Sequence, residues 1–265
     1  MNMEKKEYKI LDKGFVRVVE MMGNDNSIVQ AARVSYGEGT KHTSQDRALI
    51  RYLMRHKHTS PFEMCEIKLH LKMPMVIGEQ WLRHRTASIN KYSGRYSIMQ
   101  DEFYIPNLKD IAAQSSSNKQ GREDVFDEES AKKIQEIYVQ NSQNCYQEYE
   151  KLLEKGAARE LARMVLPANI YTQFYWKCNL HNLMHFMALR SHPTSQYEIR
   201  MYSQCLEEIV KEWVPMCYEA FIDYKKEAVN VSKHMKQFLK KIVLNEQELE
   251  NLGKTEILEF EKEWS

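Results

Sequence analysis

The chain has 265 residues, enough for one large domain or two small ones with a substantial buried core. Its 38 Lys and Arg nearly balance its 37 Asp and Glu, so no bulk charge favours binding to nucleic acid or to an anionic membrane. No signal sequence, membrane-length apolar run or CxxC pair is present and the five cysteines are scattered, which predicts a reduced cytoplasmic protein with no metal site.

The first third of the chain predicts two strands and several short helices. Residues 15–22 and 65–73 show the period of two that is typical of strands, and the second segment alternates apolar with charged residues. That alternation indicates a sheet with one buried face and one face toward water or a ligand. A first helix is expected over 28–33, with its cap at 25–27. A second helix is expected to begin at a capping box of Thr43 and Asp46, and a third to cover 76–84.

The remainder is richer in helices. Residues 107–129 are polar and predict a surface loop, and a long helix is expected from about 130 to 155, with Gly156 at its C-cap. A short helix over 159–166, a strand over 170–178 and helices over 181–190 and 196–214 follow, the last ending at Pro215. Residues 1–224 are thus expected to form one domain, and residues 225–265 a polar helical extension with a capping arrangement at Asn245 and Glu248.

The stretch from Arg83 to Ser97 has the clearest functional signal. It contains three arginines and one lysine, no acid, and several hydroxyl side chains. Guanidinium groups stay charged and are costly to bury unpaired, so this stretch is not core. Arginine, hydroxyl and backbone N–H donors match phosphate oxygens, and Gly94 permits a close approach of the backbone. We expect an irregular segment that binds one or two phosphates.

The same stretch resembles the flavin-dependent thymidylate synthases. It matches the signature RHRxxSxNxxSxR of that family at every fixed position: Arg83, His84, Arg85, Ser88, Asn90, Ser93 and Arg95. Other segments that look like the family follow in family order, among them residues 31–36, 60–63, 163–167 and 183–190. The similarity covers roughly residues 15–224.

The resemblance implies a fold and a reaction. The fold would be α+β, an antiparallel β-sheet packed with helices in a single catalytic domain that assembles as a homotetramer with shared active sites. The reaction would convert dUMP to dTMP, taking a methylene group from 5,10-methylenetetrahydrofolate and a hydride from FAD that NADPH has reduced, and releasing tetrahydrofolate. In such enzymes the cofactor supplies the hydride chemistry and the protein orients it.

The resemblance also implies which residues bind the ligands. Arg190 would be catalytic, since a guanidinium at the uracil favours ionisation at N3 without exchanging a proton. The expected dUMP ligands are Gln80, Arg83, Lys91, Ser93, Gly94, Arg95, Arg163 and Arg190. The expected FAD ligands are Ser60, Arg83, His84, Arg85, Lys91, Asn179, His181 and His185. Lys91 departs from the family, whose members usually carry Glu at this position.

Some alternatives remain open at this stage. His181 and His185 share a helix face and could bind zinc, but the Glu expected after the first His is absent and no third ligand is evident. Either histidine could also simply pack beside the sheet. A non-catalytic nucleotide- or RNA-binding module is disfavoured by the balanced charge. A catalytically inactive family member is the remaining alternative.

Overall fold

The computed structural model describes residues 4–34, 43–116 and 121–239. The chain divides into two compact units, Met1–Lys226 and Glu227–Ser265. In the second unit one helix is described, α10 (Lys233–Leu239). The capping arrangement expected at residues 245 and 248 lies outside the described residues. No helix in the described ranges is both long enough and apolar enough to cross a bilayer.

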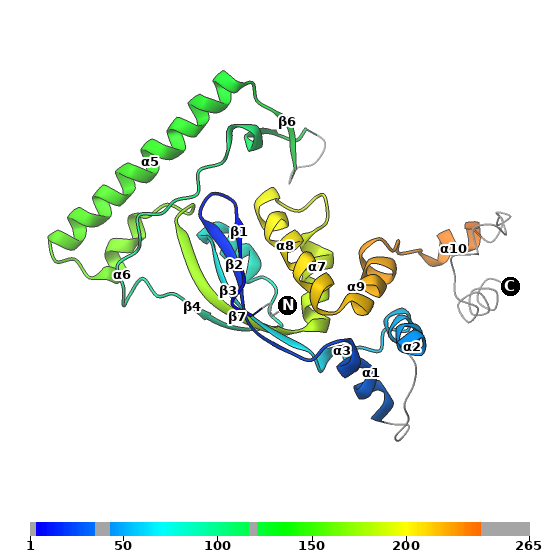
Figure 1. Cartoon of the computed structure of the whole chain (residues 1–265). Coiled ribbons are helices and arrows are strands. Elements are labelled where there is room, and N and C mark those ends of the chain that lie inside the picture. The colour runs from blue at the N-terminus through cyan, green and yellow to red at the C-terminus, as the bar shows by residue number, and fades with distance from the viewer. Residues whose placement is uncertain (1–3, 35–42, 117–120, 240–265) are drawn as a thin grey trace. The chain divides into compact units, whose positions relative to one another are not determined.

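The first unit is built on a five-stranded antiparallel sheet (Figure 1). Its strands, in spatial order, are β1 (Glu7–Ile10), β2 (Gly14–Met22), β3 (Glu66–Pro74), β7 (Tyr171–Asn179) and β4 (Ser88–Lys91). The three strands predicted from alternation are confirmed to within one residue at each end. The expected α+β class with an antiparallel sheet is therefore confirmed.

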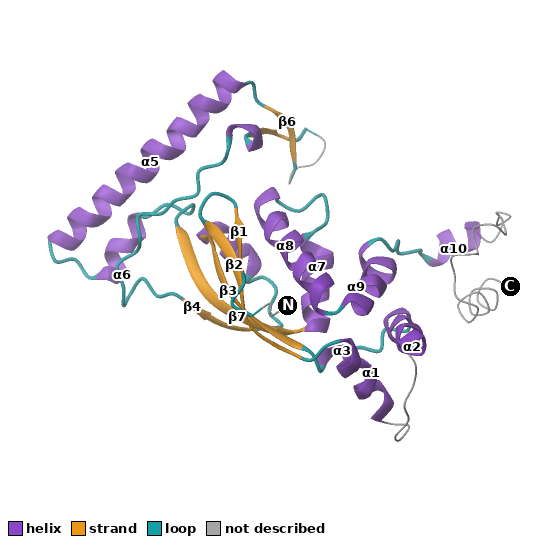
Figure 2. Cartoon of the chain, in the orientation of Figure 1, coloured by secondary structure: helices purple, strands orange, loops and turns teal. Residues whose placement is uncertain are grey.

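One face of the sheet forms the core. Ile67, Leu69, Leu71 and Met73 of β3 are buried and lie in register with β7, where Trp176 is buried opposite Leu69. The helices α4 (Met75–Trp81), α7 (Leu180–Arg190) and α8 (Tyr197–Trp213) pack on this face (Figure 2). Full burial of each large apolar side chain contributes roughly 1.5–3 kcal/mol, so this layer dominates the stability of the unit.

A second group of helices surrounds one end of the sheet: α1 (Asp25–Arg33), α2 (Thr43–Arg55), α3 (Ser60–Glu63), α9 (Pro215–Phe221) and the π-helical turn η4 (Ile222–Lys226). The cap expected at residues 25–27 is wrong in detail, because Asn24 and Ser27 form the capping box of α1. The buried Asp25 instead accepts hydrogen bonds from the N–H groups of Met216 and Cys217 at the start of α9. The side chain of Thr43 lies outside the described residues, and Asp46 pairs with Arg33.

Two expectations about irregular segments are wrong. The arginine-rich stretch contains the short strand β4, which pairs with β7. The expected loop 107–129 contains the 3-10 turn η2 (Leu108–Asp110) and a two-stranded sheet of β5 (Ala112–Gln114) and β6 (Arg122–Val125). Both segments consist mostly of polar or exposed residues, so they lack the apolar alternation that reveals a half-buried strand.

The predicted helices are found with small changes at their ends. The long helix is α5 (Glu128–Glu154), capped by Asp127, and Gly156 follows it with a positive φ of 79°. The helix expected over 159–166 is split into α6 (Arg159–Ala162) and the 3-10 turn η3 (Arg163–Val165). The helix expected over 76–84 ends at Trp81, so the arginine-rich stretch begins on a turn.

Candidate active site

The arginine-rich stretch is anchored at both ends by the core. Before it, Trp81 is fully buried, and its ring lies 5.4 Å from the ring of Trp176 and 4.2 Å from that of Phe186. After β4, the N–H of Tyr92 donates to the carbonyl of Gln173 at 2.9 Å. Between these anchors Arg83 and Arg85 are exposed. The fold thus fixes the backbone of the stretch while its guanidinium groups remain available to a ligand.

Arg190, at the end of α7, lies against Gln80, at the end of α4. The Nη2 of Arg190 donates to the Gln80 carbonyl at 3.3 Å. The Nε of Arg190 and the Oε1 of Gln80 are both buried, and neither has a hydrogen-bond partner within the part of the chain that the structure describes. Burial and the neighbouring Arg83 guanidinium lower the pKa of Arg190. Buried polar atoms without partners are rare in proteins, so this donor and this acceptor are candidates for contact with a ligand.

His84 is buried beside this pair. Its ring lies 6.2 Å from Trp176 and 5.7 Å from His185, and its Nε2 is 2.9 Å from the hydroxyl oxygen of Thr86. Burial, followed by His185 and Arg190, lowers the pKa of His84. The imidazole is therefore neutral near pH 7, where it can accept or donate a hydrogen bond without adding to the local positive charge.

The expected flavin ligands on α7 fall into two kinds. The side-chain oxygen of Asn179 accepts from the N–H of Asn182 at 2.9 Å and caps the helix, a structural task that the sequence did not reveal. His181 and His185 lie one turn apart and line the same small cavity. Burial is the main cause that lowers the pKa of His181. Ser60 is exposed at the first position of α3, which packs against α7.

The residues expected to bind phosphate lie on the turn after β4. Gly94 is buried, and a Cβ placed on it would lie 3.2 Å from the Cδ of Arg163 and 2.9 Å from the Sδ of Met99. Arg95 is 59% exposed and forms an ion pair with Glu160 of α6, with 2.9 Å between Nε and Oε2. The turn that carries Ser93 thus lies against Arg163, which is distant in sequence.

Apart from Lys91, which lies on β4, the expected dUMP ligands form two groups. The first group comprises Gln80, Arg83 and Arg190, and the second comprises Ser93, Gly94, Arg95 and Arg163. No hydrogen bond or ion pair joins the two groups in the described parts of the chain. Figure 1 shows α6 and α7, which carry or adjoin the two groups, on opposite sides of the sheet. Within one copy of the chain the two groups thus make no direct polar contact with each other.

Comparisons with known proteins identify the family of the chain. A model of the family described as "Thymidylate synthase complementing protein" matches residues 17–216. A flavin-dependent thymidylate synthase of Anaplasma marginale is 57% identical over 94% of this chain and 87% of its own length. One from Gluconobacter oxydans is 52% identical over 97% of this chain and 85% of its own.

The chain belongs to the family of flavin-dependent thymidylate synthases. It is thus an enzyme, a methyltransferase that depends on a flavin. A solved structure described as the UMP/dUMP methylase PolB from Streptomyces cacaoi bound with 5-Br dUMP has a TM-score of 0.76 and 29% sequence identity. The match covers 83% of this chain and 99% of that one.

Lys91, where members of the flavin-dependent thymidylate synthase family usually carry Glu, has a partner in the same chain. Its Nζ donates to Glu79 of α4 at 2.8 Å. The Glu79 carboxylate is 64% exposed and the Lys91 side chain 28% exposed. An acid on the neighbouring helix therefore compensates the reversed charge within the motif.

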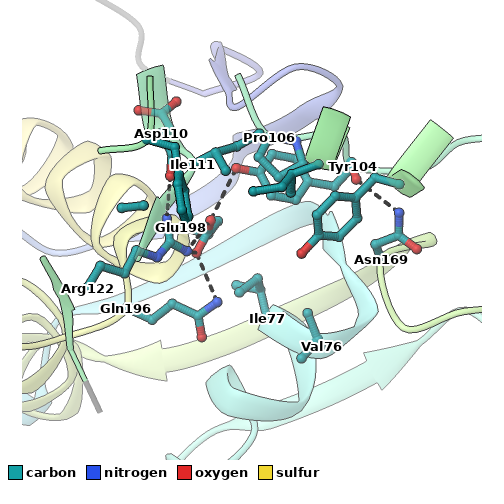
Figure 3. A pocket seen from close by; sticks show the side chains of 14 residues that line it. Val76, Ile77, Tyr104, Pro106, Asp110, Ile111, Arg122, Asn169, Gln196 and Glu198 are labelled. Atoms are coloured by element: carbon teal, nitrogen blue, oxygen red, sulfur yellow. Dashed lines mark hydrogen bonds and ion pairs between the residues drawn. The ribbon is translucent and has the colours of Figure 1, made fainter. Parts of the chain in front are cut away.

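A further cavity of about 270 Å³ lies away from the family motif (Figure 3). Its polar side is Glu198, which is 2% exposed and accepts two hydrogen bonds from the Nη2 of Arg122, at 2.6 and 2.7 Å. Tyr104 and Gln196 also donate to this carboxylate, so all of its close partners come from the protein. No sequence motif indicates this cluster, because its residues lie on β6, at position 104 and on α8 and come together only in the folded chain.

Proposed function

We propose that this enzyme converts dUMP to dTMP, with 5,10-methylenetetrahydrofolate as one-carbon donor and FAD, reduced by NADPH, as hydride source, and that it releases tetrahydrofolate. The observation that carries the proposal is the pair of buried, unpartnered atoms, Gln80 Oε1 and Arg190 Nε, beside a complete family motif. A pyrimidine ring presents both N–H donors and carbonyl acceptors, which match such a pair.

In this proposal Arg190 is the catalytic residue. Its side chain lies among other cations, with Arg83 near it, and an anion in the site would relieve their repulsion. A uracil ring that loses its N3 proton is such an anion, and a guanidinium stabilises it without giving up a proton. Ser93, Gly94, Arg95 and Arg163 bind the phosphate, which accepts hydrogen bonds from hydroxyl, guanidinium and backbone donors.

The residues expected around FAD fit an anionic cofactor. Exposed Arg85, neutral His84 and the two α7 histidines provide donors on one side of α7, and Ser60 lies on the helix that packs there. These side chains would hold the cofactor and exclude water from it. When bound, the reduced flavin supplies the hydride that completes the methyl group. Lys91, at the β4 edge between the two ligand sets, would contribute positive charge to both.

We also propose that the enzyme is a homotetramer whose subunits share active sites. The two groups of dUMP ligands lie apart in one chain, so a complete site needs groups from different copies. The turn around Arg95 is bordered by exposed apolar side chains that suit burial in an interface: Tyr96 at 77%, Ile98 at 53%, Leu161 at 61% and Met164 at 75%. Residues 1–224 form the catalytic domain and residues 225–265 an extension of it. All five cysteines are free thiols, in keeping with a cytoplasmic location.

Spectroscopy and a tritium assay test the function together. The purified protein is expected to be yellow, with a flavin spectrum that NADPH bleaches anaerobically, and to release tritium from 5-³H-dUMP when methylenetetrahydrofolate is present. Arg190→Ala is expected to retain the flavin spectrum and lose nearly all tritium release. A yellow wild-type protein that releases no tritium would favour the alternative, a non-catalytic nucleotide-binding member of the family.

A further inference from the structure

A small cavity opens along one face of α7, on the side of the expected flavin ligands. Its volume is about 100 Å³. Four residues of α7 at helical spacing line it: His181, Met184, His185 and Ala188. Two residues from elsewhere complete the wall, Met54 of α2 and Lys225 of η4. The cavity therefore has an apolar floor and three side chains that can donate hydrogen bonds.

Lys225 is held in place by its neighbours. Asp223 forms an ion pair with Arg51 of α2, and the Arg51 guanidinium also lies over the Tyr224 ring, 4.8 Å from its centroid. On the other side, Lys226 donates to the buried Glu207 of α8 at 2.6 Å. The backbone around Lys225 is thus attached to two helices, whereas the Lys225 side chain has no ion pair or hydrogen bond in the described parts of the chain.

The turn that carries Lys225 is itself unusual. Residues 222–226 form a π-helical turn directly after α9. Such turns are rare, cost backbone stability and occur frequently at functional sites. Here the turn places residues 223, 224 and 226 against protein partners and leaves residue 225 on the cavity. Lys225 is itself exposed, so its ammonium group is accessible to a ligand at this cavity.

The charge in the cavity favours an anion. The ammonium of Lys225 is close enough to His181 to oppose its protonation, and His185 acts in the same direction. Glu63 of α3 is the acid that acts against them. His185 connects this cavity to the motif, because its ring lies near that of His84, and His84 in turn lies near Arg190. Lys225, the histidines and Arg190 thus provide donors along this side, with Glu63 as an acid near His181, and this balance suits an anionic ligand.

We propose that Lys225 is a cofactor-binding residue whose ammonium group contacts the diphosphate of the flavin dinucleotide, next to His181 and His185. The inference rests on the proposed function, since it requires FAD as the cofactor. It assigns a ligand role to a residue that lies outside the family motif and beyond residues 17–216, the part that the family model matches. Lysine contacts phosphate as a point charge on a flexible stem, so a single fixed lysine at the cavity suffices.

Flavin titrations test the assignment. The full-length flavin-free protein is titrated with FAD and with riboflavin, which lacks the diphosphate, and binding is followed by flavin fluorescence. Lys225→Ala is expected to raise the Kd for FAD roughly tenfold and to leave the Kd for riboflavin unchanged, because one charge-assisted contact is lost. Lys225→Arg is expected to bind FAD nearly as well as wild type. Lys211→Ala removes an exposed lysine of α8 as a control for net charge.

A second measurement uses the unaltered protein. Acetylation of Lys225 by acetic anhydride, followed by mass spectrometry, is expected to slow several-fold when FAD is bound, whereas acetylation of Lys211 is expected to stay constant. Equal FAD affinity of the Lys225→Ala and Lys211→Ala proteins, or equal losses of FAD and riboflavin binding, would overturn the assignment. Failure of the wild-type protein to bind FAD at all would be recognised separately, since it removes the proposed function too.

Discussion

Lys91 shows how a single residue can differ from its family without leaving a charge uncompensated. The ion pair with Glu79 connects β4 to α4 at the point where the motif begins. Exposed ion pairs contribute little, because solvent screens them and long side chains must be ordered. The pair therefore matters mainly for where the Lys91 ammonium points.

We expect Lys91→Glu to lower the free energy of unfolding by about 0.5–1 kcal/mol, since it sets two carboxylates side by side. Adding Glu79→Lys should restore most of the loss, because the pair is then reversed. Chemical denaturation of the two single variants and the double variant measures this coupling. Simple additivity of the two losses would contradict the pair. Loss of dUMP affinity in Lys91→Glu that Glu79→Lys does not recover would assign the lysine to the phosphate.

Gly94 allows a close approach between the motif turn and Arg163. We expect Gly94→Ala to weaken dUMP binding about tenfold, because the added methyl displaces the Arg163 side chain from its position. The Tm should fall little, since the atoms in its way are side-chain atoms of Met99 and Arg163. Isothermal titration with dUMP measures the affinity.

Gly78→Ala is the matched control for that variant. A methyl at Gly78 meets its nearest atom at 3.6 Å, an ordinary contact, and the residue lies within α4. Alanine favours a helix over glycine by up to about 1 kcal/mol, so this variant should be as stable as wild type or more so. Equal dUMP affinities of the two variants would mean that the approach of Arg163 to the turn has no part in binding.

Among the larger elements, the β5–β6 sheet is attached to α8 by one ion pair. Arg122 of β6 joins the buried Glu198 of α8. Burial alone would raise the pKa of Glu198, but the bonds from Arg122 and Gln196 outweigh burial and lower it. A carboxylate stabilised in this way loses its support when the arginine is removed.

Arg122→Ala is therefore expected to lower the free energy of unfolding by about 2–3 kcal/mol, toward the low end for a buried pair because Arg122 is 37% exposed. Adding Glu198→Gln should recover part of that loss by removing the uncompensated charge. Lys132→Ala, which breaks an exposed i,i+4 pair with Glu128, should cost no more than about 0.5 kcal/mol. Equal losses for Arg122→Ala and Lys132→Ala in urea denaturation would contradict this role.

The same elements show what can be read from a sequence. The strand over residues 65–73 was predictable because burial on one face imposes a period of two on the side chains. The strand β4 was not, since it is an edge strand whose residues are mostly exposed and are held by backbone bonds to β7. Likewise the motif predicts a set of ligand-binding residues, whereas Lys225 became a candidate only because the fold places it and α7 on one cavity.

At the scale of the whole molecule, the proposed sharing of active sites can be tested with mixed subunits. We expect Arg190→Ala and Arg95→Ala to be inactive separately, because each removes one of the two groups of dUMP ligands. Mixed one to one under conditions that exchange subunits, they should regain activity, since some sites then receive an intact group from each parent. About a quarter of wild-type tritium release is expected if each site draws one group from each of two subunits at random.

The control for that experiment is a mixture of Arg190→Ala with Gln80→Ala. Both changes fall in the first group of dUMP ligands, where the two residues contact each other in one chain. Neither variant can then supply an intact first group, so no activity should return. Recovery in this control, or its absence in the first mixture, would contradict the shared site. Sizing by light scattering establishes whether each variant assembles as the wild type does.

The order of strands in the sheet has a consequence for how the enzyme folds. β3 pairs with β7 along their whole length, with Glu66 opposite Asn179, yet the motif, the small sheet and α5 all lie between them in sequence. Closing so long a segment costs chain entropy before the pairing returns any stability. Gln80 lies on the helix that follows β3, and Arg190 lies on the helix that follows β7. We therefore expect the contact between them to form only after these two strands have paired. Ligand-binding competence should therefore appear late in refolding, with the slow phase of sheet formation.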